Sequence, residues 1–348
     1  MAKKVYVGLS GGVDSSVTAA LLKEQGYDVT GVYMKNWSQD LPGFVCPWKE
    51  DYQDAKRVAV HLGIPFKMYD FEKEYRHKVV DYMIDGYKAG LTPNPDIMCN
   101  QEVKFKLFLE TALQDGADMI ATGHYARIQD GRLLTGLDKN KDQSYFLYRV
   151  TEDALRHSLM PIGEYEKPKV REIAKRLGLN TAEKKDSQGI CFVGKVGIKE
   201  FLQQFVTTEP GTIFDQHKQE VGEHDGALFY TIGQRHGLNV GGGLPYYVVG
   251  KDMDKNEVYV TTDLQDERLW SRELELASPH WINNEPNPGT IYGVRTRYRA
   301  GLVPVTAIKK LPNGNWHLTL KDEVRAITPG QSAVLYDGEH MLGGGIVL

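Results

Sequence analysis

The chain has 348 residues, of which 41% are hydrophobic and 25% charged, with a formal net charge of −4 and three cysteines. These numbers predict a soluble globular protein of two to three domains, and the acidic balance excludes a uniformly basic nucleic-acid binder. Three widely separated cysteines exclude a disulfide framework and, without a Cys-x-x-Cys spacing, disfavour a zinc site. The sequence lacks an apolar run that could span a membrane, and we expect a cytoplasmic protein with no membrane partner.

The first 130 residues alternate between strand and helix patterns, the order of an α/β fold with a doubly wound parallel sheet. Ligands of such sheets bind at the carboxyl ends of the strands. The loop after Leu9, Met34 and Gly123 all fall at that edge, which predicts a nucleotide site there. The predicted strands are 5–9, 29–34, 66–69 and 117–122, and the predicted helices are 16–22, 52–62, 71–89 and 103–114.

The first strand leads into a glycine-rich turn, Gly8-Leu9-Ser10-Gly11-Gly12-Val13-Asp14-Ser15-Ser16, which opens a helix. Such a turn presents backbone N–H groups and the positive end of the helix dipole to an anion. Asp14 adds a carboxylate where a divalent cation that bridges phosphates could bind. The turn lacks the Gly-Lys-Ser/Thr of a Walker A loop. Its Ser-Gly-Gly-x-Asp-Ser pattern instead resembles the pyrophosphate loop of the N-type ATP pyrophosphatases, which split ATP into AMP and pyrophosphate.

Two cysteines stand in dense polar motifs. Cys99 follows the stiff loop Asn94-Pro95-Asp96 just before a predicted helix, where a thiol has a lowered pKa and where we do not expect a buried side chain. Cys191 follows a turn with two nearby lysines, and mobility of that turn would let a sulfur move between donor and acceptor. Two alternatives stay open: Cys191 as an apolar packing residue, and Asp96 as the cap of the helix that follows it.

In the second half of the chain, the sequence pattern changes from alternating strands and helices to short strands. Helix patterns over 168–177 and 198–205 are followed by short strand patterns separated by Gly, Asn and Asp, which predict a small β-rich unit and then a β-barrel, a common mount for RNA-facing surfaces. The predicted domains are therefore 1–205, 206–270 and 271–348. The predicted strands are 227–232, 246–250, 258–261, 291–297, 303–308, 316–320 and 332–336.

Together with the glycine-rich turn, Asn94-Pro95-Asp96-Ile97-Met98-Cys99-Asn100 and Asp186-Ser187-Gln188-Gly189-Ile190-Cys191-Phe192 resemble the tRNA-specific 2-thiouridylase family. Shorter matches extend the resemblance over essentially the whole chain. Leu91 and Gln101 depart from the family pattern, which has Arg and Lys there, so RNA phosphate contacts would be weakened or moved to nearby lysines. Cys46 receives no role. The shorter matches are 34–37, 121–127, 140–147, 233–235, 297–299 and 328–331.

The resemblance implies ATP-dependent 2-thiolation of the wobble uridine in tRNAs for Lys, Glu and Gln. ATP would adenylate the C2 oxygen of a flipped-out uridine, and AMP and pyrophosphate would leave. Cys191 would carry a persulfide from a cysteine desulfurase or a sulfur-relay protein. Its terminal sulfur would attack C2 directly, or Cys99 would release it as sulfide and form a Cys99–Cys191 disulfide. Asp96 would act as general acid/base.

The resemblance also implies the residues that bind each substrate. ATP would be held by the glycine-rich turn and two further loops, with magnesium near Asp14, and tRNA would be held by residues of the first and last domains. The ATP set is Gly8, Leu9, Ser10, Gly11, Gly12, Val13, Asp14, Ser15, Met34 and Gly123. The tRNA set is Asn94, Pro95, Asp96, His124, Lys141, Asp142, Gln143, Arg297, Tyr298 and Gln331.

Two rival functions remain. An amide-forming or tRNA lysidine-type ligase of the same fold would use an amine as nucleophile and would not need Cys99 or Cys191. A non-catalytic RNA-binding or sulfur-carrier protein would show no tRNA-stimulated release of AMP and pyrophosphate.

Overall fold

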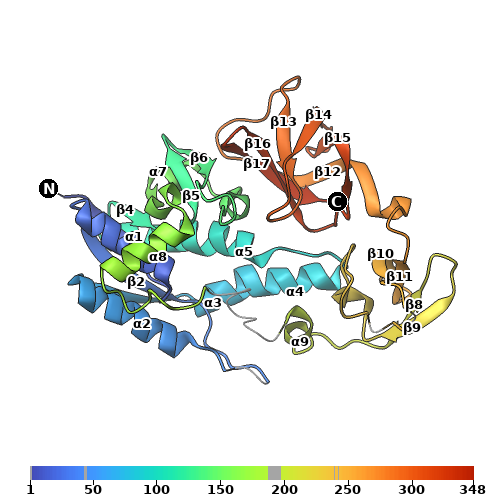
Figure 1. Ribbon diagram of the computed structural model, residues 1–348, viewed down its shortest axis with the longest axis horizontal. Coiled ribbons are helices and arrows are strands. Elements are labelled where there is room, and N and C mark those ends of the chain that lie inside the picture. The colour runs from blue at the N-terminus through green and yellow to red at the C-terminus, as the bar shows by residue number, and fades with distance from the viewer. Residues whose placement is uncertain (1, 43–44, 187–196, 239, 242) are drawn as a thin grey trace.

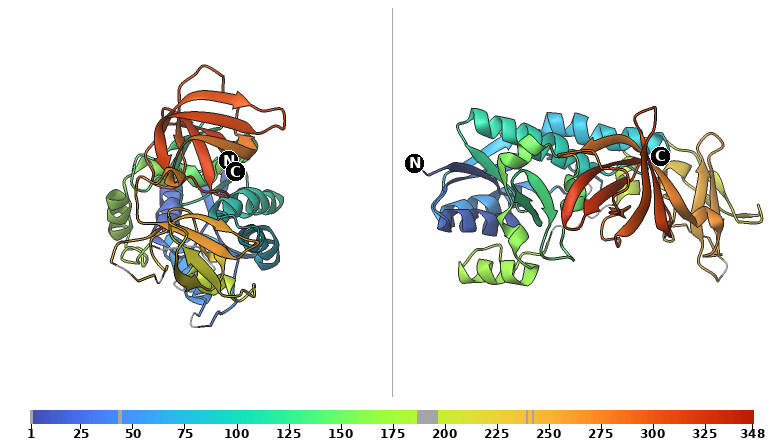
Figure 2. Two further views of the ribbon diagram at one scale, coloured as in Figure 1. Left: turned by 90° about the vertical axis from the view of Figure 1, so that its right-hand side faces the viewer. Right: turned by 90° about the horizontal axis from the view of Figure 1, so that it is seen from above.

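The computed structural model describes residues 2–42, 45–186, 197–238, 240–241 and 243–348. Cys191 and the turn before it therefore lie outside the described residues. The molecule is elongated, with a parallel sheet at one end, a smaller sheet at the other, and a barrel beside the long helices between them (Figures 1 and 2). Within the described ranges, every helix is too short or too polar to cross a membrane.

The N-terminal part is built on a five-stranded sheet in which all neighbouring strands are parallel. The strand order is β3-β2-β1-β4-β7, so the chain moves outward on one side of β1 and then crosses to the other side. This confirms the doubly wound sheet, whose switch point lies between β1 and β4. The strands are β1 (Lys4–Gly8), β2 (Asp28–Lys35), β3 (Phe66–Asp70), β4 (Met119–Ala121) and β7 (Ser158–Leu159).

Helices cover both faces of this sheet (Figure 1). Val5 and Val7 pack on one face with apolar residues of α1, α2 and α8, whereas Tyr6 packs on the other with residues of α3, α4 and α6. Successive side chains of a strand point to opposite faces, and burial of both faces explains the apolar run in β1. The helices are α1 (Val13–Glu24), α2 (Trp48–Leu62), α3 (Glu72–Tyr75), α4 (Asp81–Lys88), α6 (Phe108–Gln114), α7 (Glu152–Arg156) and α8 (Lys167–Arg176).

The segment that carries Cys99 becomes helical earlier than the sequence pattern predicts. The helix expected over 103–114 begins instead with α5 (Pro95–Met98) and continues through wider π-helical turns (Cys99–Leu107) into α6. Proline is compatible with the first helical position, and the Asn94 side chain caps the helix by accepting the backbone N–H two residues on, at 3.1 Å. Cys99 therefore lies inside a helical segment, and π-helical turns are frequent at functional sites.

The middle part is a four-stranded sheet in the order β10-β11-β8-β9, preceded by α9 (Ile198–Leu202). The strand predicted over 227–232 is wrong. Residues Ala227–Phe229 form a 3-10 turn, because Gly226 has a φ of 142° and the Ala227 N–H bonds the Asn256 side chain at 2.9 Å instead of a strand. The strands are β8 (Gly211–Phe214), β9 (Glu220–His224), β10 (Tyr247–Asp252) and β11 (Glu257–Thr261).

The C-terminal strands form an antiparallel barrel that is closed by pairing of β12 with β17. Its sheet continues beyond β17 into the hairpin β5–β6 of the N-terminal part, through pairing of Met341 with Leu133. Two strands from near residue 130 thus extend a barrel made by the last 80 residues. The strands are β5 (Ala126–Gln129), β6 (Arg132–Thr135), β12 (Trp270–Trp281), β13 (Tyr292–Arg295), β14 (Val303–Lys310), β15 (Trp316–Arg325), β16 (Ser332–Asp337) and β17 (His340–Val347).

Candidate active site

The glycine-rich turn between β1 and α1 is held in one conformation by its own hydroxyl groups. The Ser10 N–H donates to the Ser15 hydroxyl at 3.1 Å, and the Ser15 and Ser16 hydroxyls donate to the Gly12 carbonyl at 3.2 and 2.7 Å. Gly11 has a φ of 76°, and a Cβ there would overlap the Asp51 carbonyl oxygen. The first N–H groups of α1 have no carbonyl one turn earlier in the helix to bond, so the turn is a ready-made anion site.

The three strand-end loops meet as the sequence predicts. A Cβ on Gly8 would lie 2.9 Å from the Met34 Cε, and a Cβ on Gly123 would lie 2.8 Å from the Ser15 backbone nitrogen. Gly123 therefore lets the loop after β4 lie directly against the glycine-rich turn of residues 8–16, which we call the phosphate loop. The whole predicted ATP set is gathered at one edge of the sheet.

Asp14 is engaged by two neighbours that sequence reasoning missed. Its carboxylate accepts hydrogen bonds from Lys167 Nζ at 2.8 and 2.9 Å and from the Tyr125 hydroxyl at 2.7 Å. Burial and the nearby Asp14 charge raise the pKa of Tyr125, which keeps its hydroxyl a donor. Lys167 also contacts Asp186 at 2.8 Å. In the sequence, only a local excess of basic residues over 167–200 marks Lys167, because its partner Asp14 is far away along the chain.

Asp96 and Cys99 occupy two environments at the start of one helical segment. Burial raises the pKa of Asp96, against the opposing effect of the Lys104 charge. Asn94, not Asp96, caps the helix, so the capping alternative for Asp96 is not what the structure shows. Cys99 is only 4% exposed and packs in the apolar core, which corrects the expectation that this motif leaves it accessible.

The loop after β4 connects the Cys99 segment to the phosphate loop. The Phe105 ring, on the helical segment of Cys99, lies 5.6 Å from the His124 ring, centroid to centroid. His124 is buried, its Nδ1 lies 2.7 Å from the Thr122 hydroxyl, and burial lowers its pKa well below the usual range. His124 is therefore neutral, and any contact it makes with RNA would be a hydrogen bond or stacking.

The motif Lys141-Asp142-Gln143 follows β6 and has three separate contacts. Lys141 pairs with Asp186 at 2.8 Å, and the Gln143 side chain accepts the Tyr125 N–H at 3.0 Å. Asp142 is buried and pairs with Arg295 of the barrel at 3.0 Å. Of the three, Lys141 is the residue with a charged group at a partly exposed position.

The barrel residues predicted to contact tRNA lie along the junction with the N-terminal part. Arg297 donates to the carbonyls of residues 325 and 326 at 2.7 and 2.8 Å. The Tyr298 ring packs 4.5 Å from the Phe146 ring, and the Gln331 amide donates to the Thr92 carbonyl at 2.7 Å. The Phe146 carbonyl in turn accepts the Asn100 side chain at 3.0 Å. The two predicted tRNA-contacting regions are thus in direct contact around the Cys99 segment.

Comparison with known proteins covers nearly the whole chain. Three family models match: "tRNA methyl transferase HUP domain" over residues 3–195, "tRNA methyl transferase PRC-barrel domain" over 199–262 and "Aminomethyltransferase beta-barrel domain" over 271–347. Proteins named tRNA-specific 2-thiouridylase MnmA from Lysinibacillus sphaericus and Bacillus subtilis are each 48% identical over 351 residues, 99% of this chain and 94% of the relative. One from Listeria monocytogenes is 49% identical over 350 residues, with the same coverage.

The chain belongs to the tRNA-specific 2-thiouridylase family. Membership makes it a sulfurtransferase that modifies tRNA, as the two cysteine motifs predict. The full-length relatives decide between this activity and the methyl transfer that the shorter family models name, because their similarity extends through all three parts of the chain.

Gln101, one of the two residues that we expect from the sequence to depart from the family pattern, has a charged neighbour. Its side-chain oxygen accepts a hydrogen bond from Arg149. The Arg149 guanidinium thus places a positive charge beside this position. Lys106, one of the lysines considered as a replacement, is paired with Glu102 at 3.3 Å.

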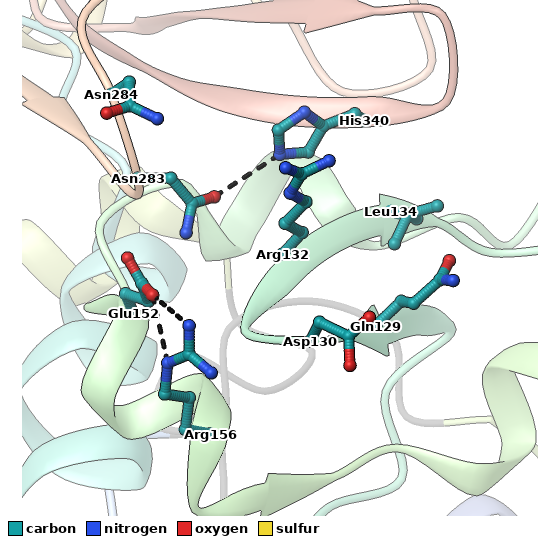
Figure 3. A pocket seen from close by; sticks show the side chains of 9 residues that line it. All are labelled: Gln129, Asp130, Arg132, Leu134, Glu152, Arg156, Asn283, Asn284 and His340. Atoms are coloured by element: carbon teal, nitrogen blue, oxygen red, sulfur yellow. Dashed lines mark hydrogen bonds and ion pairs between the residues drawn. The ribbon is translucent and has the colours of Figure 1, made fainter.

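One well-formed cavity among the described residues is separate from this site. It has a volume of about 490 Å³ and lies between the β5–β6 hairpin, α7 and the barrel (Figure 3). Arg156 pairs there with Glu152, and His340 contacts Asn283 at 3.4 Å. None of the predicted ATP, tRNA or catalytic residues lines it, so its size does not mark the reaction site. Its lining is Gln129, Asp130, Arg132, Leu134, Glu152, Arg156, Asn283, Asn284 and His340.

Proposed function

We propose that this enzyme uses ATP and magnesium to replace the C2 oxygen of the wobble uridine with sulfur in tRNAs for Lys, Glu and Gln. The observation that carries this proposal is the contact of three elements. The phosphate loop lies against Gly123, and the next residue, His124, packs against Phe105 of the helical segment that carries Asp96 and Cys99. Asn100 of that segment bonds the carbonyl of Phe146, whose ring packs against the predicted tRNA-binding residue Tyr298. Activation by ATP, sulfur chemistry and RNA binding would thus share one region.

The phosphate loop would hold the pyrophosphate part of ATP through its backbone N–H groups and serine hydroxyls. Met34 and Gly123 would border the adenosine. Asp14 is the one carboxylate of the phosphate loop, so a magnesium ion there would be bound mainly through the phosphate oxygens of ATP. The ion would neutralise charge on the departing pyrophosphate.

The proposed sulfur transfer needs two cysteines. In one route, the terminal sulfur of a Cys191 persulfide attacks C2, AMP leaves with the former C2 oxygen, and the Cys99 thiolate then attacks Cys191 Sγ. That last step releases 2-thiouridine and forms a Cys99–Cys191 disulfide. In the other, Cys99 first displaces sulfide from the persulfide, with the same disulfide, and sulfide attacks C2. In both, an external thiol must reduce the disulfide before the next cycle.

Asp96 would handle protons on the pyrimidine. Burial raises its pKa, which favours the protonated form and suits a carboxyl group that donates and accepts a proton. Because a base in a stack cannot reach a buried thiol, the uridine would flip out, with Tyr298 available to stack on a neighbouring base and Lys141 and Arg297 to meet phosphates.

A nucleoside analysis tests the proposal. Unmodified tRNA for Lys or Glu is incubated with the enzyme, Mg-ATP, a cysteine desulfurase and cysteine, then digested and examined by mass spectrometry for 2-thiouridine. We expect product from the wild type and from the matched control Cys46→Ser, and none from Cys99→Ser or Cys191→Ser. If no 2-thiouridine forms and tRNA-stimulated AMP release is the same in the wild type, Cys99→Ser and Cys191→Ser, the ligase alternative is favoured. Absence of tRNA-stimulated AMP release would favour the non-catalytic one.

A further inference from the structure

The electrostatic environment of the phosphate loop presents a problem that the proposed function does not solve. Asp14 lies in the first turn of α1, where a nucleotide's phosphates would approach, and a carboxylate there repels a polyanion. A cation beside Asp14 would reduce this repulsion. The sequence points to magnesium, but the cation that the structure places on Asp14 is Lys167.

Lys167 is built into the site. It is the first residue of α8, its backbone N–H is fixed by the Asp138 carboxylate at 2.9 Å, and its side chain is only 9% exposed. Its Nζ contacts both carboxylate oxygens of Asp14 and one oxygen of Asp186. α8 packs against α1, so the ammonium group is held against the phosphate loop by two helices.

Lys167 also links the loop to other predicted functional segments. Asp186 accepts Lys141 at 2.8 Å and Arg171 at 2.7 Å in addition to Lys167. Lys141 belongs to the predicted tRNA-contacting motif, and Asp186 lies five residues before Cys191 in the sequence. The bridge from Asp14 through Lys167 to Asp186 thus joins the phosphate loop to the start of the Cys191 motif.

We propose that Lys167 is a positioning residue for ATP: it neutralises Asp14, so that the phosphate loop accepts the nucleotide, and anchors the loop to Asp186. This inference rests on the proposed ATP-dependent function and assigns a further residue to it. Lys167 acts through Asp14, which separates its role from that of a general structural ion pair. Removal of Lys167 should weaken ATP binding strongly, and removal of the Asp14 charge as well should restore part of it.

The test compares Lys167→Met, Lys167→Arg, Asp14→Asn and the double variant Asp14→Asn/Lys167→Met. The matched control is Lys169→Met, since Lys169 lies on the same helix, is exposed and, among the described residues, forms its ion pair with Glu172, at 2.6 Å. The KM for ATP and the KM for tRNA are measured from tRNA-stimulated AMP release. Binding of α,β-methylene-ATP in the presence of magnesium is measured by calorimetry.

We expect Lys167→Met to raise the KM for ATP and the dissociation constant of the analogue about tenfold or more, with the KM for tRNA unchanged. Lys167→Arg should keep most of the affinity, and the double variant should bind ATP better than Lys167→Met. If Lys167→Met does not fold, the double variant and Lys167→Arg still decide, because Asp186 keeps Lys141 and Arg171 as partners in both.

Three results would overturn the inference. The first is an unchanged affinity for ATP in Lys167→Met, and the second is an equal loss of affinity for ATP and for tRNA. The third is an equally low affinity for ATP in Asp14→Asn, Lys167→Met and the double variant. The last would mean that Asp14 serves the nucleotide directly, as a magnesium ligand would. A wild type that releases AMP without forming 2-thiouridine would refute the proposed thiolation and leave the Lys167 comparison readable.

Discussion

At the scale of single residues, the site contains two kinds of residue. Some are fixed by the local backbone conformation, and others reach the site only through packing between distant parts of the chain. The glycines of the phosphate loop belong to the first kind, since φ at Gly11 and the close approach at Gly123 leave no room for a side chain. A strand followed by such a turn is readable from sequence. Lys167 belongs to the second kind, because its position depends on packing between helices 150 residues apart.

Gly123→Ala is expected to impair ATP use selectively. The new Cβ would lie within 3 Å of the Ser15 nitrogen and the Asp14 carbonyl carbon, both backbone atoms that can move only with the phosphate loop. We expect the KM for ATP to rise about tenfold or more, a loss of about 1.4 kcal/mol of binding. Steady-state AMP release measures this. Gly301→Ala, at a position with no atom within 4 Å of the new Cβ, should leave it unchanged.

Asp96→Asn is expected to lower thiolation about 100-fold or more, the usual contribution of a general acid/base. The same substitution is expected to stabilise the folded protein. Because burial raises the pKa of Asp96 in the folded state, the folded protein binds the proton more tightly than the unfolded chain, and wild-type stability falls as the pH rises through this raised pKa. In Asp96→Asn, the free energy of unfolding should decrease less as the pH rises, because asparagine does not titrate. Urea unfolding of both proteins between pH 4 and 8 checks this, and parallel pH profiles would contradict it.

At the scale of elements, the helical segment that starts at Pro95 shows what the sequence pattern misses. Two prolines and two polar residues are typical of a loop, and this pattern predicts one. The decisive interactions are the Asn94 cap and the burial of Ile97 and Cys99 in a core formed by other helices, and neither periodicity nor spacing reveals that core. Four of the five parallel strands, by contrast, are predictable from their apolar runs, whereas the two-residue β7 is too short to give such a pattern.

Gly86→Ala tests how closely α4 supports this segment. Alanine in a helix is normally about 1 kcal/mol more favourable than glycine. Here a Cβ would lie 2.7 Å from the Pro93 ring, at the start of the Asp96–Cys99 motif, so we expect this gain to be lost and the motif displaced. Thiolation should fall several-fold with the KM for ATP unchanged. Lys88→Ala, at an exposed position of α4, is the control, and a more stable, fully active Gly86→Ala would refute the expectation.

At the scale of the whole molecule, the barrel and the N-terminal part share a buried polar junction. Asp142 pairs with Arg295, the Ser144 hydroxyl lies 3.2 Å from that of Tyr336, and the Tyr145 hydroxyl donates to a barrel carbonyl at 2.7 Å. The three parts of the chain are predictable in order and type. Their junction is not, since each of these polar side chains could equally face solvent when judged from its neighbours in sequence.

Arg295→Met should weaken this junction strongly. It leaves the Asp142 carboxylate, 2% exposed, without its charged partner, and loss of one partner of a buried pair typically costs about 3–5 kcal/mol. The double variant Asp142→Asn/Arg295→Met should lose less. Urea unfolding followed by tryptophan fluorescence measures both, and a similar loss in the exposed pair variant Lys310→Met would show that the cost does not come from burial.

The shared sheet has a consequence for how the protein is made. The β5–β6 hairpin leaves the ribosome long before β17, its partner, which lies about 200 residues later. At about 5–20 residues per second, that edge of the hairpin waits about 10–40 s for its partner. An unpaired strand edge is a template for pairing with other chains. During this interval the edge at residues 132–135 is open to pairing with other chains, and slow translation of the last domain would lengthen its exposure to aggregation.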